Sequence, residues 1–421
     1  MKIGRESILK PIAQTAGRQV GGGALQLTTL LFIAHDLGPA NMGTVALVQA
    51  LQQLLVLLCG LGLGSAKVFF AAQGMLSDKE VRRWEYQVLV VAVLAMCMLS
   101  MTAYFWQWPI VVGLLPAHLA LAVVGGLAAL LFDWRLNGLL AAKQVKRYNL
   151  YFLLQAGLYA SGILFAWLLG ALSVWAVLLL NGGVALFVAL LLPALPPMER
   201  AEGNDQAGGV SFGQYLIYGL KSQAANVVTF AVYRMNYFAL NYTAGPTQLG
   251  IFSVAVGICE KLWVVSQAAA TVIFPYTAFA KSEAKGVGFA IRSDMVKSTL
   301  LFTAVGSVIL LMLTGWLSDT VLNGKYPGLA LVVLGLVPGV LSWAAVRVIS
   351  AQFSGFGYPG INLWASIVTC AINVVLLGAM WPVSNAMTVA AIMSVMYFTG
   401  LLFIVLVAMR FNRNSQASEP L

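Results

Sequence analysis

The sequence predicts an all-α polytopic membrane protein with twelve transmembrane helices in two parallel six-helix repeats. Hydrophobic residues make up 60% of the 421 residues and charged residues only 9%, whereas soluble domains carry about 25% charge. Apolar runs of about twenty residues, the length that crosses a bilayer, recur along the whole chain. The alternating pattern of a membrane β-barrel is absent from the sequence, and lipid accepts only helices or closed barrels.

Twelve apolar segments follow one another, and short polar or glycine-containing stretches separate them. They cover residues 8–35, 42–65, 86–105, 110–141, 150–169, 174–192, 212–240, 250–274, 297–317, 328–350, 361–380 and 387–408. The basic N-terminus precedes an apolar stretch that is too long for a signal peptide. We therefore expect the first segment to be a retained helix.

Lys and Arg residues are distributed unevenly between the predicted loops. With a cytoplasmic N-terminus, 17 of them fall in cytoplasmic tails and loops, and Lys325 alone falls on the opposite face. The positive-inside rule then places both termini in the cytoplasm. That placement requires an even number of helices.

The longest polar stretch has the Pro, Gly and charge content of a linker and divides the segments into two sets of six. The predicted organisation is an N-terminal six-helix lobe (1–195), a cytoplasmic linker (196–211), a C-terminal six-helix lobe (212–409) and a cytoplasmic tail (410–421). A G-P-x-x-[ML]-G motif begins at Gly38 and again at Gly245, 207 residues later, at the same point of each half. This match indicates a duplication, and six helices per half make the repeats parallel.

Six cations lie inside the apolar segments: Arg18, Arg135, Lys221, Arg234, Lys261 and Arg347. Only Asp133 and Glu260 accompany them as acids. Each such cation costs about 2.5–3.5 kcal/mol in lipid unless it faces water, a partner or a ligand. The excess of positive charge predicts an anionic ligand.

The candidate substrate-binding cations are Arg18, Lys221, Arg234 and Lys261. Arginine suits phosphate because its planar guanidinium makes two parallel hydrogen bonds. Asn226 and Arg234 lie two four-residue steps apart on one helix face. The predicted polar lining of the cavity comprises Gln49, Gln53, Asn226 and Gln267.

Several of these charges also have a structural interpretation. Arg18 could reach the interface by snorkelling, and Lys261 could pair with an acid. Arg347 could be an inner-interface anchor, and Asp133 with Arg135 an interfacial ion pair. Glu260 is either a counter-ion for a cation or, like Asp133, a candidate for ion coupling. The 207-residue displacement relates Glu260 to Gln53.

Known catalytic and nucleotide-binding patterns are absent from the sequence. It contains no GxxxxGK[ST] motif, and the run Gly60-Leu61-Gly62-Leu63-Gly64 ends a membrane helix. We interpret that run as a close-packing or bending element. The four cysteines lie in apolar segments without CxxC spacing, so no disulfide, metal site or cofactor is predicted. The cations are dispersed through short loops, which argues against a nucleic-acid partner. The chain is predicted not to be an enzyme.

The layout and three motifs resemble a known family. The stretch D-L-G-P-x-x-M-G at 36–43, a Gln- and Gly-rich helix ending L-G-L-G-S-A at 61–66, and the basic residue Arg18 in the first helix resemble Wzx-type polysaccharide flippases of the MOP superfamily. The resemblance implies a MOP/MATE-like fold in the bacterial inner membrane. It implies alternating access that moves undecaprenyl-diphosphate-linked oligosaccharide, such as an O-antigen or exopolysaccharide repeat unit.

The same resemblance implies a lipid-linked glycan and membrane lipid as partners, polysaccharide polymerase machinery nearby, and a proton or sodium gradient as the driving force. It places Arg18, with Arg234 and Lys221, in a basic cavity. Three alternatives stay open: a cation-coupled small-molecule exporter of the MATE type, a lipid II flippase, and a scaffold without transport activity. Arg18 stands where several MATE exporters have an acid, and MurJ-like lipid II flippases have fourteen helices.

Overall fold

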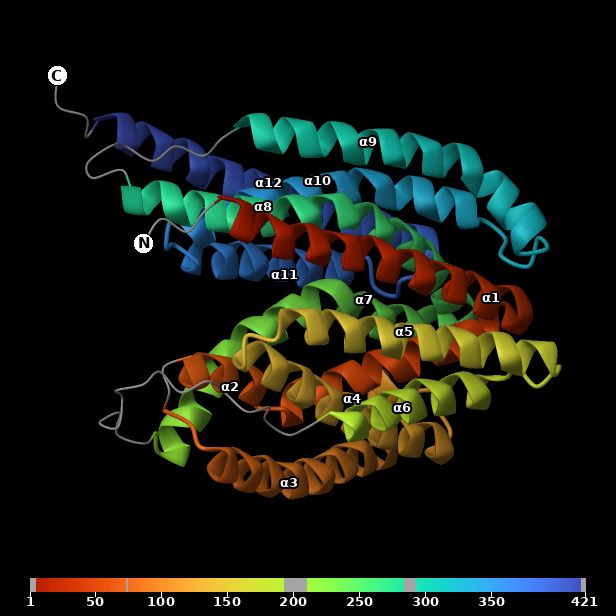
Figure 1. The fold of residues 1–421 in the computed structure, drawn as a ribbon. Coiled ribbons are helices and arrows are strands. Elements are labelled where there is room, and N and C mark those ends of the chain that lie inside the picture. Colours follow the sequence, from red (N-terminus) through yellow and green to blue (C-terminus); the bar gives the residue numbers. More distant parts are fainter. Residues whose placement is uncertain (1–4, 73–74, 193–209, 284–292, 418–421) are drawn as a thin grey trace. The chain divides into compact units, whose positions relative to one another are not determined.

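The computed structural model describes residues 5–72, 75–192, 210–283 and 293–417, and these ranges contain helices and no strand (Figure 1). The helices are α1 (Arg5–Cys59), α2 (Leu63–Ala72), α3 (Asp78–Phe105), α4 (Pro116–Ala141), α5 (Val145–Leu168), α6 (Val174–Leu191), α7 (Phe212–Cys259), α8 (Trp263–Glu283), α9 (Ser293–Trp316), α10 (Leu329–Gly355), α11 (Gly360–Ala379) and α12 (Ala386–Ala417). Short helical turns are η1 (Pro109–Val111), η2 (Glu260–Leu262) and η3 (Leu317–Val321). Most of the predicted linker 196–211 lies outside the described residues.

Two helices, α1 and α7, are each much longer than a membrane is thick. Each contains one non-helical glycine, Gly38 with φ 71° and ψ 175°, and Gly245 with φ 81° and ψ 177°. A proline follows both glycines, and positive φ is a conformation that glycine adopts readily. The two motifs that the sequence pairs therefore form the same kink, which supports the predicted duplication.

Ten helical stretches of the described chain are long and apolar enough to cross a membrane. Two of them, Gly21–Cys59 and Phe212–Thr271, contain the kinks and so make two passes each, which agrees with twelve transmembrane helices. Large apolar side chains such as Leu94 and Met312 are exposed, and exposed tryptophans lie near helix ends, among them Trp106, Trp316 and Trp381. This distribution is typical of lipid-facing helices with interfacial aromatic belts. The chain is a multi-pass membrane protein.

The chain forms two compact units. Unit 1 comprises Met1–Ala40 and Thr243–Leu421, and unit 2 comprises Asn41–Tyr242. Both boundaries lie within three residues of the glycine kinks. This division differs from the predicted lobes 1–195 and 212–409, because the first pass of each half belongs to the unit formed by the other half. Sequence repeats give the order of the helices, whereas packing depends on which way the chain turns at each kink.

In unit 2 the glycine run after α1 is a packing element, as predicted. Leu61 and Gly62 have positive φ, and a Cβ on Gly62 would lie 2.1 Å from the carbonyl oxygen of Gly219 on α7. The Tyr215 hydroxyl donates to Leu63 O at 3.1 Å next to this crossing. The first part of α7 is thereby fixed against the break between α1 and α2.

In unit 1, α10 packs against α8, α9 and α12 (Figure 1). Pro338 interrupts the hydrogen-bond ladder of α10. The Ser394 hydroxyl of α12 fits into this interruption, because it accepts from Gly339 N at 3.0 Å and donates to Gly335 O. Gly339 has no room for a Cβ, which would meet Ser394 Cα at 2.7 Å. The joint between α10 and α12 is therefore close and uncharged.

Candidate functional site

In unit 2 the structure brings together two of the predicted residues, Arg234 and Gln53. Arg234 lies on α7 before its kink, and its Nε donates to Gln53 Oε1 on α1 at 3.4 Å. The guanidinium carbon also lies 5.1 Å from the ring centroid of Tyr237, within range of a cation–π interaction. The amide and the ring orient the guanidinium, and neither of them carries a net charge.

The other predicted residues of unit 2 are arranged along α7 and α1. Asn226 is exposed and donates to Gln223 Oε1 at 3.2 Å, while Gln223 in turn donates to Leu57 O. Gln49 is half-buried, one turn before Gln53. Lys221 is exposed, and helix geometry places it about 140° around α7 from Arg234. These two cations therefore lie on different faces of the helix.

In unit 1 a break in the helical chain positions Lys261. The single turn η2 separates α7 from α8 and contains Glu260 and Lys261, both half-buried. Lys261 Nζ donates to Gln26 Oε1 on α1 at 2.9 Å. Here too the amide orients a cation. Arg18 lies eight residues before Gln26 on α1, about 12 Å along the helix, and its side chain lies outside the described residues.

Arg347 belongs to the same part of unit 1, although the sequence suggested only an interfacial anchor. Its Nη1 donates to the predicted residue Gln267 on α8, and its guanidinium carbon lies 4.6 Å from the ring centroid of Trp263. The indole of Trp263 is itself fixed by donating to Val340 O at 3.1 Å. The sequence identified Gln267 as a polar residue within an apolar segment. It gave no signal that the partner of Gln267 would be Arg347 on α10.

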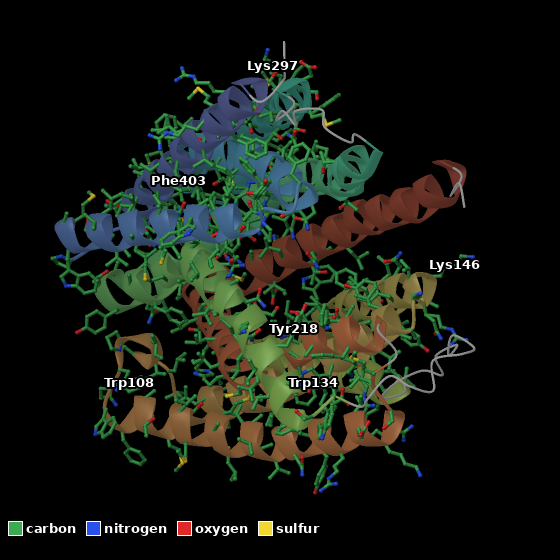
Figure 2. The ribbon with its side chains drawn as sticks, turned by 90° about the vertical axis from the view of Figure 1, so that its left-hand side faces the viewer. Trp108, Trp134, Lys146, Tyr218, Lys297 and Phe403 are labelled. Carbon is green, nitrogen blue, oxygen red and sulfur yellow. The ribbon has the colours of Figure 1, made fainter. Side chains whose placement is uncertain are left out.

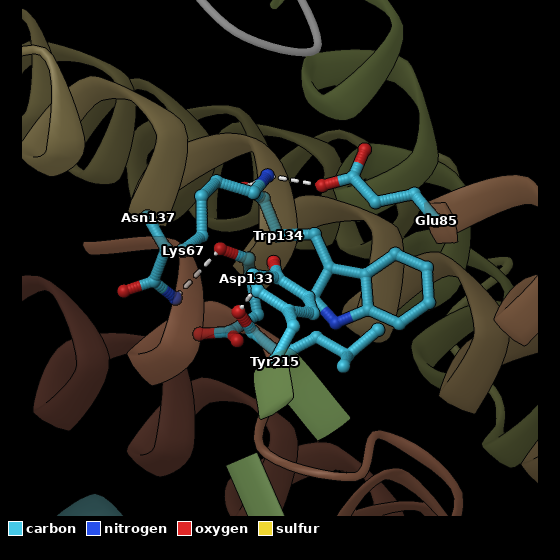
Figure 3. Close-up of polar contacts among 7 residues, drawn as sticks. Lys67, Glu85, Asp133, Trp134, Asn137 and Tyr215 are labelled. Atoms are coloured by element: carbon cyan, nitrogen blue, oxygen red, sulfur yellow. Dashed lines mark hydrogen bonds and ion pairs between the residues drawn. The ribbon is translucent and has the colours of Figure 1, made fainter. Parts of the chain in front are cut away.

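A charged network centred on Lys67 lies beside Asp133 in unit 2 (Figure 3). Lys67 on α2 is fully buried, forms an ion pair with Glu85 on α3, and donates to Trp134 O at 2.9 Å. Burial lowers the pKa of Lys67, and the Glu85 carboxylate opposes that shift. The sequence counted Lys67 among the loop cations, so this buried pair was missed. It ties α2 to α3 and α4.

Asp133 is exposed at the edge of this network. Asn137 donates to the Asp133 backbone oxygen at 2.9 Å, and a Cβ on Gly64 would lie 3.2 Å from Asp133 Oδ2. The small size of Gly64 thus makes room for the carboxylate beside α2. Within the described ranges, no group of three His, Cys, Asp or Glu side chains is placed to hold a metal ion.

Comparison with known proteins gives structural matches alone. No family model and no curated protein matches the sequence. A lipid II flippase MurJ in an inward closed conformation aligns with TM-score 0.70 and 12% identity over 97% of this chain and 91% of that one. The chain has the fold of the MOP superfamily.

Two further structures share this MOP fold. An inward-facing multidrug resistance MATE transporter of the MOP superfamily aligns with TM-score 0.57 and 15% identity, over 100% of this chain and 98% of that one. A MOP superfamily transporter from Pyrococcus furiosus, described as having a binding pocket of reverse polarity, aligns with TM-score 0.52 and 15% identity over 97% and 96%. At these identities the likeness establishes the fold, in agreement with the twelve-helix prediction.

Proposed function

We propose that this chain is a flippase that moves an undecaprenyl-diphosphate-linked oligosaccharide, such as an O-antigen or exopolysaccharide repeat unit, across the bacterial inner membrane. The observation that carries the proposal is the way three of the six cations in the apolar segments are held. Arg234, Lys261 and Arg347 each donate to a glutamine oxygen. The glutamine amide is neutral, so such a contact orients the cation without adding a counter-charge.

A diphosphate is the ligand chemistry that these cations suit best. Guanidinium and ammonium groups make charge-assisted hydrogen bonds with phosphate oxygens, and arginine can do so bidentately. Each cation within an apolar span costs about 2.5–3.5 kcal/mol when nothing compensates it. A bound diphosphate would offset part of that cost, and a lipid tail would stay in the bilayer.

The fold agrees with this proposal. A MOP protein described as a lipid II flippase aligns over nearly the whole chain, and a lipid II flippase acts on a lipid-linked substrate. We infer alternating access by the two units, with both termini in the cytoplasm and a proton or sodium gradient as the driving force. Glu260 and Asp133 are the proposed coupling acids, and polysaccharide polymerase machinery is the proposed neighbour.

Deletion of the gene tests the proposal. The deletion strain should accumulate a cytoplasm-facing lipid-linked oligosaccharide, measured by extraction and accessibility to a membrane-impermeant glycosidase. The wild-type gene should clear it, whereas Arg234→Gln with Lys261→Gln should not, at equal membrane abundance. Arg83→Gln, an exposed arginine on α3, is the matched control and should behave as wild type. Absence of any accumulation, or full rescue by the double variant, would contradict the proposal.

A small-molecule exporter is the second candidate, favoured by the MATE transporters that share the fold and by Glu260 in the broken turn η2. It predicts efflux of a soluble compound that depends on an imposed pH gradient in proteoliposomes. Glu260→Gln should abolish that efflux. If efflux by the wild type and by Glu260→Gln does not depend on the pH gradient, this candidate is excluded.

A further inference from the structure

The start of α5 departs from the usual charge pattern of a helix. Lys143 precedes the helix, and Lys146 and Arg147 lie in its first turn, which contains no acid. Cations are unfavourable at a helix N-terminus because the helix dipole is positive there. The side chain of Gln144 at the cap position accepts no hydrogen bond from the backbone N–H groups of the first turn. Three cations therefore lie at the start of α5, and no side chain caps the backbone N–H groups of its first turn.

The start of α3 provides a comparison within the same unit. Successive helices run in opposite directions, and Trp108, just after α3, lies at the opposite end of unit 2 from Lys146 (Figure 2). The starts of α3 and α5 thus share one end. α3 also carries three cations, but Ser77 and Glu80 form a capping box. The positive-inside rule explains the cations at both places, and it leaves the missing cap of α5 unexplained.

One contact directs a cation of α5 toward the start of the helix, and the backbone is tightly turned just before it. Lys143 has φ 58°, a conformation that glycine usually adopts at the end of a helix. Arg147 Nη1 donates back to Gln144 Oε1 at 3.0 Å. Lys143, Lys146 and Arg147 are all exposed, so a ligand can reach them.

Asn149 supplies the independent observation. Its side chain is 8% exposed, and neither its amide nitrogen nor its amide oxygen has a hydrogen-bond partner in the described structure. Helical side chains tilt toward the N-terminus, so this amide lies over the first turn of α5. Buried amides nearly always have partners. A ligand at the start of the helix would provide one.

We propose that the start of α5 binds a phosphate group through Lys143, Lys146, Arg147 and Asn149. Helix N-termini bind phosphate through free backbone N–H groups, and the cations supply charge-assisted hydrogen bonds. Because α5 is a membrane-spanning helix, its end lies at headgroup level, where an anionic phospholipid presents such a phosphate. A soluble phosphate has the same chemistry. The site is separate from the proposed transport residues, so it does not depend on the transport proposal.

Native mass spectrometry of the full-length chain in detergent, with phosphatidylglycerol, phosphatidylcholine and inorganic phosphate as probes, tests the site. The wild type should retain phosphatidylglycerol in preference to phosphatidylcholine. The triple variant Lys143→Gln, Lys146→Gln, Arg147→Gln should lower that retention at least tenfold. The matched triple Lys79→Gln, Arg82→Gln, Arg83→Gln on α3 should lower it less than threefold. Retention that survives excess inorganic phosphate assigns the site to the headgroup, and displacement assigns it to soluble phosphate.

Asn149→Leu separates a binding role from general surface charge, because it leaves the three cations in place and replaces a buried amide with an apolar side chain of similar size. Its unfolding temperature in detergent should stay at or above that of the wild type, while retention of the bound phosphate falls severalfold. Equal losses in the α3 and α5 triples, or unchanged retention in Asn149→Leu, would overturn the proposal.

Discussion

Each unit contains a hydrogen bond between a cation and a glutamine, but the helix segment that carries the cation differs. In one unit the cation precedes a kink, and in the other it follows a kink. In unit 2 the cation Arg234 belongs to α7 before its kink, and Gln53 belongs to α1 after its kink. In unit 1 the amide Gln26 belongs to α1 before its kink, and Lys261 follows the kink of α7. The 207-residue displacement relates Gln53 to Glu260 and Gln26 to Tyr233. Lys261 therefore comes one residue after Glu260, the counterpart of Gln53. In the same way, Arg234 comes one residue after Tyr233, the counterpart of Gln26.

This difference shows that the repeated backbone and the side chains determine different features of the contact. The duplicated kinks determine which two helices meet and at which level of the repeat. They leave open which of the two helices carries the charge. A one-residue offset turns a side chain by about 100° around a helix, and the long stems of Lys and Arg can still reach an amide across that offset.

Removal of both cations should have the largest effect on transport. Each lost charge-assisted contact with substrate is worth about 1.5–3 kcal/mol, so Arg234→Gln or Lys261→Gln alone should lower the rate about tenfold or more. Together they should lower it at least a hundredfold if both units bind the substrate. The measurement is the rate of glycolipid flipping in proteoliposomes at matched protein content. A double variant no slower than one single variant would show that only one unit matters.

The helix joints of the two units should differ in their sensitivity to single substitutions. In unit 2, Lys67→Met removes one partner of a buried ion pair and should lower the free energy of unfolding by about 3–5 kcal/mol. The double variant Lys67→Met, Glu85→Leu should recover most of that loss, because no charge is left unpaired. Denaturation in detergent monitored by circular dichroism measures both. If Glu85→Leu does not restore stability, the pair stabilises the protein through its hydrogen bonds and packing as well as through charge neutralisation.

The joint of unit 1 is uncharged and should be affected less. Ser394→Ala leaves Gly339 N–H and Gly335 C=O without the hydroxyl that bridges them, at a cost of about 1–3 kcal/mol. The same unfolding assay applies, with Ser298→Ala as control, since that exposed hydroxyl only bonds within its own helix. A Ser394→Ala loss as large as that of Lys67→Met would remove the contrast between the units.

Reversing the polarity of one contact should have the smallest effect. Arg234→Gln with Gln53→Arg moves the cation of unit 2 from α7 to α1 and keeps the amide partner. The exchanged protein should flip substrate within a few fold of wild type and faster than Arg234→Gln alone. Activity equal to that of Arg234→Gln would show that the position of the charge matters, as well as its presence.

Much of the fold follows from the sequence, because its signals are local. Apolar runs, the loop distribution of Lys and Arg, and the repeated Gly-Pro motifs predict membrane helices, their number and a duplication. The structure adds that each motif is a kink, at Gly38 and Gly245, inside one long helix. The site is predicted less completely. Gln53, Gln267, Arg234 and Lys261 were identified from polar residues in apolar helices, but each partner lies on another helix far away in sequence. For that reason Arg347 was interpreted only as an interface anchor, and the Lys67–Glu85 pair was missed.

The sequence by itself determined a twelve-helix membrane protein with a duplicated half and an excess of cations in its spans. Helix length, apolarity and the preference of glycine for positive φ act within short stretches of chain, so they can be read directly. Only the tertiary structure decided that the first pass of each half belongs to the other half's unit, and which cations meet glutamines. Those outcomes depend on the direction of the chain after each kink and on side-chain packing between distant segments, which local patterns do not encode.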